Sequence, residues 1–158
     1  MKRLVVLAMT IVAMAVGCKK SDDPVVKVKA EDVEMNTAIS VAQASITNFL
    51  AAFRNPQTNQ QYFLVKGKFT AGEVVEHIWV ADLRYDGGVF HGVIANEPQS
   101  ISGLGFKQPV AVPLGRISDW MFVQDGKLMG GFTSRLLRTR MTAQRRQEAD
   151  AQNPYRYE

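Results

Sequence analysis

The apolar positions after residue 31 follow a helical period before they follow a strand period. Over residues 33–54 they recur at steps of three and four, which places them on one face of a helix. Asp32 is a suitable N-cap, and Asn55-Pro56 breaks the pattern. We therefore predict one amphipathic helix whose apolar stripe packs against a sheet. The stripe consists of Met35, Ile39, Ala42, Ile46, Phe49, Leu50 and Phe53.

Segments with strand composition fill most of the chain from residue 62 to residue 130. Turn-forming residues separate these segments, and the strongest signals are Asp86-Gly87-Gly88 and Asp125-Gly126, which are typical of tight hairpins. Strands joined by such turns pair in the antiparallel direction. The expected strands are 62–69, 73–85, 89–95, 110–112, 117–123 and 127–130.

A second helix is expected to begin at Phe132-Thr133, because Thr133 can cap it and Phe132 and Leu137 have the spacing of a hydrophobic staple. The predicted fold class is therefore α+β: an N-terminal amphipathic helix, a strongly curved antiparallel sheet of about five or six strands, and a C-terminal helix. Residues 32–141 are predicted to form a single domain. Residues 142–158 are predicted to form a polar C-terminal tail.

The hairpin closed by Asp86-Gly87-Gly88 determines which side chains share a face of the sheet. Whichever two of these residues make the turn, odd positions on one strand lie opposite even positions on the other. This register predicts that His91 lies near Asp82, and that His77 lies near Asn96 at the rim of one face. That face is expected to carry His77, Trp79, Leu83, Tyr85, Phe90, Ile94 and Asn96.

The first 17 residues have the pattern of an export signal. Two cationic residues precede an apolar or near-apolar run of 13 residues (4–16), which matches a signal h-region and is shorter than the ~20 residues of a spanning helix. Ala15-Val16-Gly17-Cys18 resembles a bacterial lipobox, although the first of these positions more often holds Leu. We expect cleavage before Cys18 and lipidation of its thiol. The alternatives are a simple export signal with an unrelated cysteine, and a transmembrane anchor.

If Cys18 carries lipid, residues 18–31 form a charged tether between the membrane and the domain. The membrane is then contacted through the lipid on Cys18, and no spanning helix is required. Cys18 is followed by Lys19 rather than Asp. By analogy with enterobacterial sorting, this predicts a location at the outer membrane, facing the periplasm.

Composition and charge remove several classes of function. One cysteine in 158 residues excludes a disulfide framework and a multi-Cys zinc site. Loss of residues 1–17 lowers the formal net charge from +4 to +2, which gives no electrostatic case for a nucleic-acid partner. The sequence has no Walker loop, dinucleotide fingerprint, Gly-x-Ser-x-Gly elbow or His-Glu-x-x-His motif. We therefore predict no cofactor.

Glu76-His77 is the first pattern that could carry chemistry. Adjacent strand residues point to opposite faces, so these two cannot chelate one ion together without a bulge, and we predict no metal site. Asp119-Trp120 is the second pattern, in which Asp can accept backbone N–H groups and Trp can supply core area. The functional alternative is a shallow groove floored by aromatic rings. The candidate binding surface comprises Glu76, His77, Trp79, Tyr85, Asn96, Asp119 and Trp120, with no catalytic residue assigned.

The chain contains EHIWV at 76–80 and ISDWMFVQDGKLMGGFT at 117–133. With several other segments, these resemble the YegJ-like bacterial family, catalogued as domain of unknown function 2314. The Glu-His-x-Trp and Asp-Trp-x-x-x-x-Asp-Gly elements, in this order and spacing, make the resemblance specific. It implies the fold and a bacterial, often envelope, setting, and it brings no established activity or catalytic residue. The segments are MNTAISVAQASITNFL (35–50), FLVKGKF (63–69), EHIWV (76–80), FHGVIANEP (90–98), ISDWMFVQDGKLMGGFT (117–133) and SRLL (134–137).

The leading functional hypothesis is an envelope lipoprotein whose domain binds another protein or a cell-wall component without catalysis. The first alternative is a small-ligand binder or enzyme that uses the region of Glu76, His77 and Trp79. The second is a tethered immunity or inhibitor protein that meets an incoming toxin. Whether the protein is an enzyme therefore stays open, although the absence of a convergent catalytic set argues against it.

Overall fold

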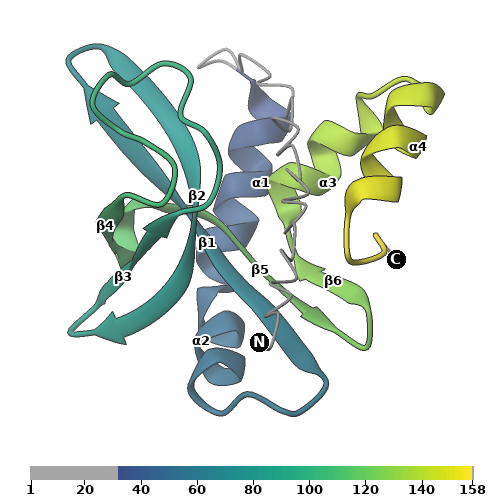
Figure 1. The fold of residues 1–158 in the computed structure, drawn as a ribbon, viewed down its shortest axis with the longest axis horizontal. Helices are drawn as coiled ribbons and strands as arrows, with labels where there is room; N and C mark the ends of the chain where they lie inside the picture. Colours follow the sequence, from purple (N-terminus) through teal and green to yellow (C-terminus); the bar gives the residue numbers. More distant parts are fainter. Residues whose placement is uncertain (1–31, 158) are drawn as a thin grey trace, which may run out of the picture.

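The computed structural model describes residues 32–157, so the predicted signal, Cys18 and the tether lie outside the described residues. An antiparallel sheet occupies the middle of the described chain, and helices precede and follow it (Figure 1). The sheet is open and curled. These features confirm the predicted α+β class.

The predicted helix over 33–54 is interrupted at Ser45. It forms α1 (Val33–Ala44) and α2 (Ile46–Arg54), and Ser45 itself has φ −101° and ψ 9°. The Ser45 hydroxyl donates a hydrogen bond to the Val41 carbonyl at 2.6 Å, a local alternative that bends or interrupts helices. The predicted N-cap is confirmed, because Asp32 Oδ1 accepts the N–H of Met35 at 3.0 Å.

The sheet has six strands in the order β4-β3-β2-β1-β5-β6, and neighbouring strands are antiparallel. Gly87 and Gly88 both have positive φ, as do Asp125 and Gly126, so both predicted hairpin turns have the mirror-image geometry that suits twisted strands. A single turn of 3₁₀ helix, Leu114–Arg116, precedes β5. The strands are β1 (Gln60–Ala71), β2 (Val74–Asp86), β3 (Val89–Ile94), β4 (Pro109–Pro113), β5 (Ile117–Gln124) and β6 (Lys127–Gly130).

A bulge in β2 changes which side chains share a face. Near the turn, Tyr85 lies opposite Phe90 as predicted, but beyond the bulge Val80 lies opposite Ile94. Asp82, with φ 51°, lies within this register shift. The prediction that His77 and Trp79 share a face with Phe90 and Ile94 is therefore wrong, and His91 lies opposite Arg84 rather than Asp82. The residues next to Asp82 in the sequence give no indication that β2 contains a bulge here.

The core lies between the sheet and the two N-terminal helices. Phe49 of α2 is fully buried at its centre, and its ring lies 5.7 Å from both Phe90 and Trp120 and 5.8 Å from Phe53 and Phe63, centroid to centroid. Such offset and edge-to-face aromatic pairs stabilise a core beyond the area that they bury. The buried hydrophobic cluster around Phe49 comprises Ala42, Phe49, Val65, Val80, Phe90, Val112, Ile117, Trp120 and Phe122.

Two helices follow the sheet, α3 (Phe132–Thr139) and α4 (Ala143–Gln152), and α3 lies beside α1 (Figure 1). The segment predicted as a polar tail thus contains a helix. Its Asp150 forms an ion pair of 2.5 Å with Arg138 of α3. The chain then returns to β6, where Arg156 accepts the N–H of Leu128 at 2.8 Å. The outer edge of β6 is therefore paired at its beginning, through an isolated bridge between Lys127 and Arg156.

Candidate functional site

The two tryptophans of the candidate surface lie on opposite faces of the sheet. Both flank β1, where Trp120 of β5 lies opposite Val65 and Trp79 of β2 lies opposite Lys66. Because consecutive residues of a strand point to opposite faces, the two indole rings are separated by the sheet itself. The structure does not bring Trp79, Trp120 and Tyr85 together in one groove.

Trp120 belongs to the core. It is 4% exposed, and its indole Nε1 donates a hydrogen bond to the Ala42 carbonyl at 2.9 Å. Tyr85 is half-buried on the same side, with its ring 4.7 Å from Phe90 and the Arg54 guanidinium 5.4 Å from its centroid. Both aromatic residues therefore hold the N-terminal helices on the sheet.

Asp119 is fully buried and organises the start of α3. Its carboxylate accepts the backbone N–H groups of Trp120 at 2.8 Å, Phe132 at 3.1 Å and Thr133 at 2.8 Å. It also accepts the Thr133 hydroxyl at 2.5 Å. A carboxylate at this place satisfies free N–H groups and complements the positive end of the helix dipole.

The predicted capping role of Thr133 is therefore taken by a residue of the neighbouring strand. The N-cap position is Gly131, with φ 66°, and no side chain at that position caps the helix. Thr133 instead links two charged groups, because its Oγ1 also accepts a hydrogen bond from Lys66 Nζ at 2.9 Å. Lys66 is 8% exposed, and its Nζ lies 4.5 Å from the centroid of the Trp79 ring.

Glu76 anchors the loop that follows β3. It is 8% exposed and accepts three backbone N–H groups, from Gln99 at 2.7 Å, Ser100 at 3.0 Å and Ile101 at 3.1 Å. Asn96 anchors the same loop from its other end, since its Oδ1 accepts the Trp79 N–H at 2.7 Å. The sequence predicts Asn96 near His77, and the structure shows that its side chain binds the backbone of Trp79, two residues further along β2.

What remains exposed among the candidates lies on the face of the sheet opposite the core. Three cross-strand pairs between β1 and β2 form this surface, which we call the Trp79 face: Thr70–Val75, Lys68–His77 and Lys66–Trp79. Lys68, Thr70 and His77 are exposed, Val75 is 48% exposed, and Trp79 is half-buried. The sequence predicts His77 and Trp79 as neighbours but does not identify the two lysines, which the register of β1 brings beside them.

Cations surround His77. Its pKa is lowered from 6.5 to about 4, first by partial desolvation of the ring and then by the ammonium groups of Lys66 and Lys68. The imidazole is therefore neutral at pH 7, and the positive charge of this face comes from the lysines. No His, Cys, Asp and Glu side chains gather into a group of three that could hold a metal ion anywhere in residues 32–157.

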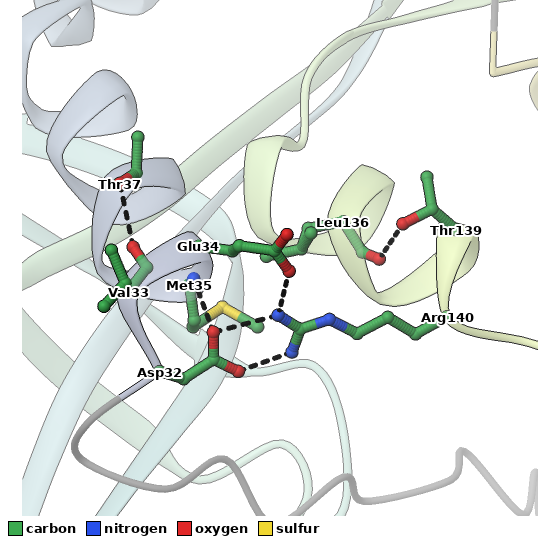
Figure 2. A network of polar contacts seen from close by, with 8 residues as sticks. All are labelled: Asp32, Val33, Glu34, Met35, Thr37, Leu136, Thr139 and Arg140. Carbon is green, nitrogen blue, oxygen red and sulfur yellow. Dashed lines mark hydrogen bonds and ion pairs between the residues drawn. The ribbon is translucent and has the colours of Figure 1, made fainter.

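A second polar cluster joins the two ends of the described chain. The Arg140 guanidinium lies between two carboxylates, donating to Asp32 at 2.5 and 2.9 Å and to Glu34 at 2.6 Å (Figure 2). These hydrogen bonds, with the N–H of Met35, lower the pKa of Asp32 to about 2. The sequence identifies Asp32 only as an N-cap, because its partner is more than a hundred residues away.

The helices within residues 32–157 lack the length and apolar character needed to cross a membrane. One shallow hollow, of about 190 Å³, lies between α3 and the C-terminal segment and is lined by Arg135, Arg138, Thr139 and Tyr157. It contains none of the candidate residues. The candidate functional site is therefore the Trp79 face.

Comparison with known proteins shows that the sequence is similar to bacterial proteins. The sequence model of a family described as "Uncharacterized protein conserved in bacteria (DUF2314)" matches residues 32–155. The chain is 27% identical over 133 residues to the uncharacterized protein YegJ of Escherichia coli K12, covering 84% of this chain and 86% of that protein. It is 44% identical over 80 residues, 51% of this chain, to a putative ankyrin repeat protein of Neisseria meningitidis serogroup B, and spans 32% of that relative's length. No solved structure matches the chain.

Proposed function

The chain belongs to the DUF2314 family of uncharacterised bacterial proteins, and we propose that it is a cell-envelope lipoprotein whose domain binds a partner through the Trp79 face. Lipid on Cys18 holds it at the outer membrane, facing the periplasm, and residues 18–31 form the tether. The observation that carries the binding role is the surface of β1 and β2 on which exposed Lys68 and His77 adjoin the half-buried Trp79.

The support for anchoring comes from the first 18 residues. Their short apolar run and the Ala-Val-Gly-Cys sequence suit export followed by lipid attachment. Two or three acyl chains, at ~0.8 kcal/mol per buried CH₂, are sufficient for a stable anchor. The described domain begins at Asp32, where Arg140 fixes the chain to the end of α3. A tether would therefore leave the domain at a defined point.

The support for binding comes from the different surroundings of the polar candidates. Glu76 and Asp119 are already occupied by backbone N–H groups, whereas Lys68 and His77 are exposed beside the Trp79 ring. Tryptophan is enriched at the centres of protein interfaces, where it supplies a large rigid contact area. A small-ligand or enzyme site built on Glu76 and His77 would need the two side chains to converge, and Glu76 is instead held by the loop at 99–101.

The test is a crosslinked pull-down of the full chain from its native envelope, with mass spectrometry of the bait and of its partners. We expect an acylated Cys18 at the N-terminus of the mature bait and one stoichiometric partner. Trp79→Ala should abolish the capture, whereas Phe106→Ala should not, because it removes an aromatic ring that is 53% exposed but lies on the loop after β3.

An unmodified, uncleaved N-terminus would overturn the anchoring part of the proposal. Capture that survives Trp79→Ala would overturn the binding face. Turnover of a small molecule that His77→Ala abolishes without unfolding would establish the enzyme alternative instead. A partner that is a toxin, neutralised by the captured complex, would identify the protein as a tethered inhibitor.

A further inference from the structure

We propose that the exposed ring of Tyr62, together with the amide side chains around the start of β1, binds a neutral glycan. The Trp79 face lies towards the other end of β1, so this is a second surface, and the inference goes beyond the proposed function. We call this surface the Tyr62 patch, and it comprises Gln57, Asn59, Gln60, Gln61, Tyr62 and Gln124.

Tyr62 is exposed because β1 contains a bulge. Between Gln61 and Leu64 the pairing with β5 shifts by one residue, so Tyr62 and Phe63 together lie opposite Phe122. The Phe63 ring stacks on Phe122 in the core, with 5.0 Å between the ring centroids. Tyr62 is 51% exposed. The bulge therefore places one aromatic side chain in the core and leaves the other at the surface.

The backbone at Tyr62 is strained. Its φ of 55° lies in the left-handed region, which bulky side chains rarely adopt because the Cβ atom crowds the neighbouring carbonyl oxygen. Among the described residues with positive φ, Tyr62 is the sole aromatic one. Such strain persists where the surrounding structure holds it, and it is found most often at functional sites. The ring is therefore kept at the surface at a cost to stability.

Amide side chains share this part of the sheet. Gln60 lies two positions before Tyr62, and side chains two positions apart in a strand share a face. Gln124 lies opposite Gln60, and the two amides form a hydrogen bond of 2.9 Å, from Nε2 of Gln60 to Oε1 of Gln124. Gln57 and Gln61 are exposed, and no other residue within 32–157 forms a hydrogen bond with their side chains. Donors and acceptors thus remain for a ligand.

A second polar pair lies at the same end of the sheet. Asn59 Nδ2 donates to Asp125 Oδ2 at 2.9 Å, and the Asp125 N–H donates to the Asn59 carbonyl at 3.1 Å. These bonds join the loop before β1 to the turn between β5 and β6 (Figure 1). The amide of Asn59 is therefore held in place, and a ligand need not order it on binding.

This combination of groups matches the chemistry of a sugar. A sugar ring presents apolar C–H groups on its faces, which can contact the negative face of an aromatic ring. At its edge it presents hydroxyl groups, which donate and accept hydrogen bonds, as amide groups also do. The side chains of the Tyr62 patch carry no charge, so a neutral glycan suits them better than an anionic or a cationic ligand.

The experiment titrates the full chain, in a zwitterionic detergent without sugar groups, with a tetramer of β-1,4-linked N-acetylglucosamine. Calorimetry measures the affinity, and NMR of the backbone amides locates the site. We expect the signals of Tyr62 and its neighbours to shift and that of Trp79 to stay unchanged. Tyr62→Ala should weaken binding at least about tenfold, because it removes the ring that contacts the sugar. Tyr62→Phe should retain binding.

Matched variants separate the patch from general surface effects. Phe106→Ala removes an aromatic ring of similar exposure, 53%, from the loop after β3 and should leave the affinity within about twofold. Gln61→Ala should weaken binding about threefold. Gln152→Ala removes an exposed amide from α4 and should have no effect. Tyr62→Gly should abolish binding without lowering the unfolding midpoint, because glycine adopts positive φ without strain.

Each contrary result overturns a different part of the inference. No binding up to the solubility limit of the tetramer would overturn the glycan. Binding that Tyr62→Ala leaves unchanged would overturn the Tyr62 patch. A lower unfolding midpoint for Tyr62→Gly would assign the ring to the stability of the fold instead. None of these results bears on the Trp79 face, whose partner should be captured equally well by the Tyr62→Ala chain.

Discussion

Trp79 and Trp120 look alike in the sequence and differ in the structure. Each lies close to an acidic residue on a strand, and each flanks β1. Trp120 lies under α1 and is 4% exposed, whereas Trp79 is half-buried on the opposite face of the sheet and contacts Lys66. The difference shows that the same local pattern, a tryptophan close to a carboxylate on a strand, gives a fully or a half-buried ring according to what covers its face of the sheet.

The first test of this comparison removes the buried carboxylate that precedes Trp120 in β5. Asp119→Ala leaves the N–H groups of Trp120, Phe132 and Thr133 without their acceptor and leaves Lys66 buried near a lost charge. We expect a loss of about 3–5 kcal/mol in the free energy of unfolding, measured by chemical denaturation. Asp86→Ala, at the exposed end of β2, should cost far less. Equal losses would show that Asp119 does not organise α3.

The second test replaces each of the two tryptophans in turn with alanine. Trp120→Ala should cost about 3–5 kcal/mol, because it opens a cavity among the rings of the core. Trp79→Ala should cost about 1–2 kcal/mol, since its ring is half-buried, and should abolish partner capture. The measurement is a pair of denaturation curves with the pull-down. A larger stability loss for Trp79→Ala would reverse the assignment of structural and binding roles.

Much of the fold is predictable because its signals are local. The steps of three and four in the first 22 helical positions, and the turn pairs at Gly87-Gly88 and Asp125-Gly126, depend only on neighbouring residues. The family resemblance is confirmed by the match over residues 32–155. The break at Ser45 is less predictable, because a serine inside a helix can equally well point to solvent.

The site is less predictable because it depends on long-range register. The bulge at Asp82 shifts the pairing of β2 by one residue, and such a slip moves every side chain beyond it to the other face. No local pattern marks that position. Asp119 likewise caps a helix that begins 13 residues later, so its role cannot be read from its neighbours. Sequence reasoning therefore placed some of the candidate residues on the wrong face of the sheet.

A third test compares the two buried carboxylates with each other. Glu76→Gln should retain part of the loop contact, because the amide oxygen can still accept one N–H, while its NH₂ group faces another donor. We expect a loss of about 1–3 kcal/mol. Hydrogen exchange should increase at Gln99, Ser100 and Ile101 and stay unchanged in α3. Glu73→Gln, at an exposed turn, is the control. Increased exchange in α3 would show that the two anchors are not independent.

A fourth test uses the pH dependence of the exposed side. The folded-state pKa of His77 is about 4, below the 6.5 of the free side chain, so the unfolded chain takes up the proton first. Stability should therefore decrease as the pH falls from about 6.5 to about 4. His77→Gln should remove this component, and His91→Gln should not. An NMR titration of His77 that gives an ordinary pKa would mean that neither desolvation of the ring nor the charges of Lys66 and Lys68 act on it as the structure indicates.

The smallest effect is expected at the surface carboxylate that joins the two ends of the described chain. The pKa of Asp32 is lowered from 3.8 to about 2, first by Arg140 and then by the N–H of Met35. A lowered carboxyl pKa gives stability that is present above about 3.8 and is lost as the pH falls towards 2. Arg140→Gln should weaken this acid dependence, while Asp32→Asn should remove it and keep an N-cap acceptor.

Asp119 is fully buried, whereas the ion pair of Asp32 with Arg140 is in partial contact with water, so neither variant should alter the unfolding midpoint at pH 7 beyond a small shift. The measurement is the unfolding free energy between pH 2 and pH 7 for both variants and for Glu148→Gln as an exposed control. A loss of unfolding free energy at pH 7 as large as that of Asp119→Ala would contradict this prediction. It would mean that the ion pairs of Arg140 stabilise the contact between α1 and α3 as much as Asp119 stabilises the contact between α3 and β5. Burial of the carboxylate would then not determine how much Asp119 and Asp32 each contribute to the free energy of unfolding.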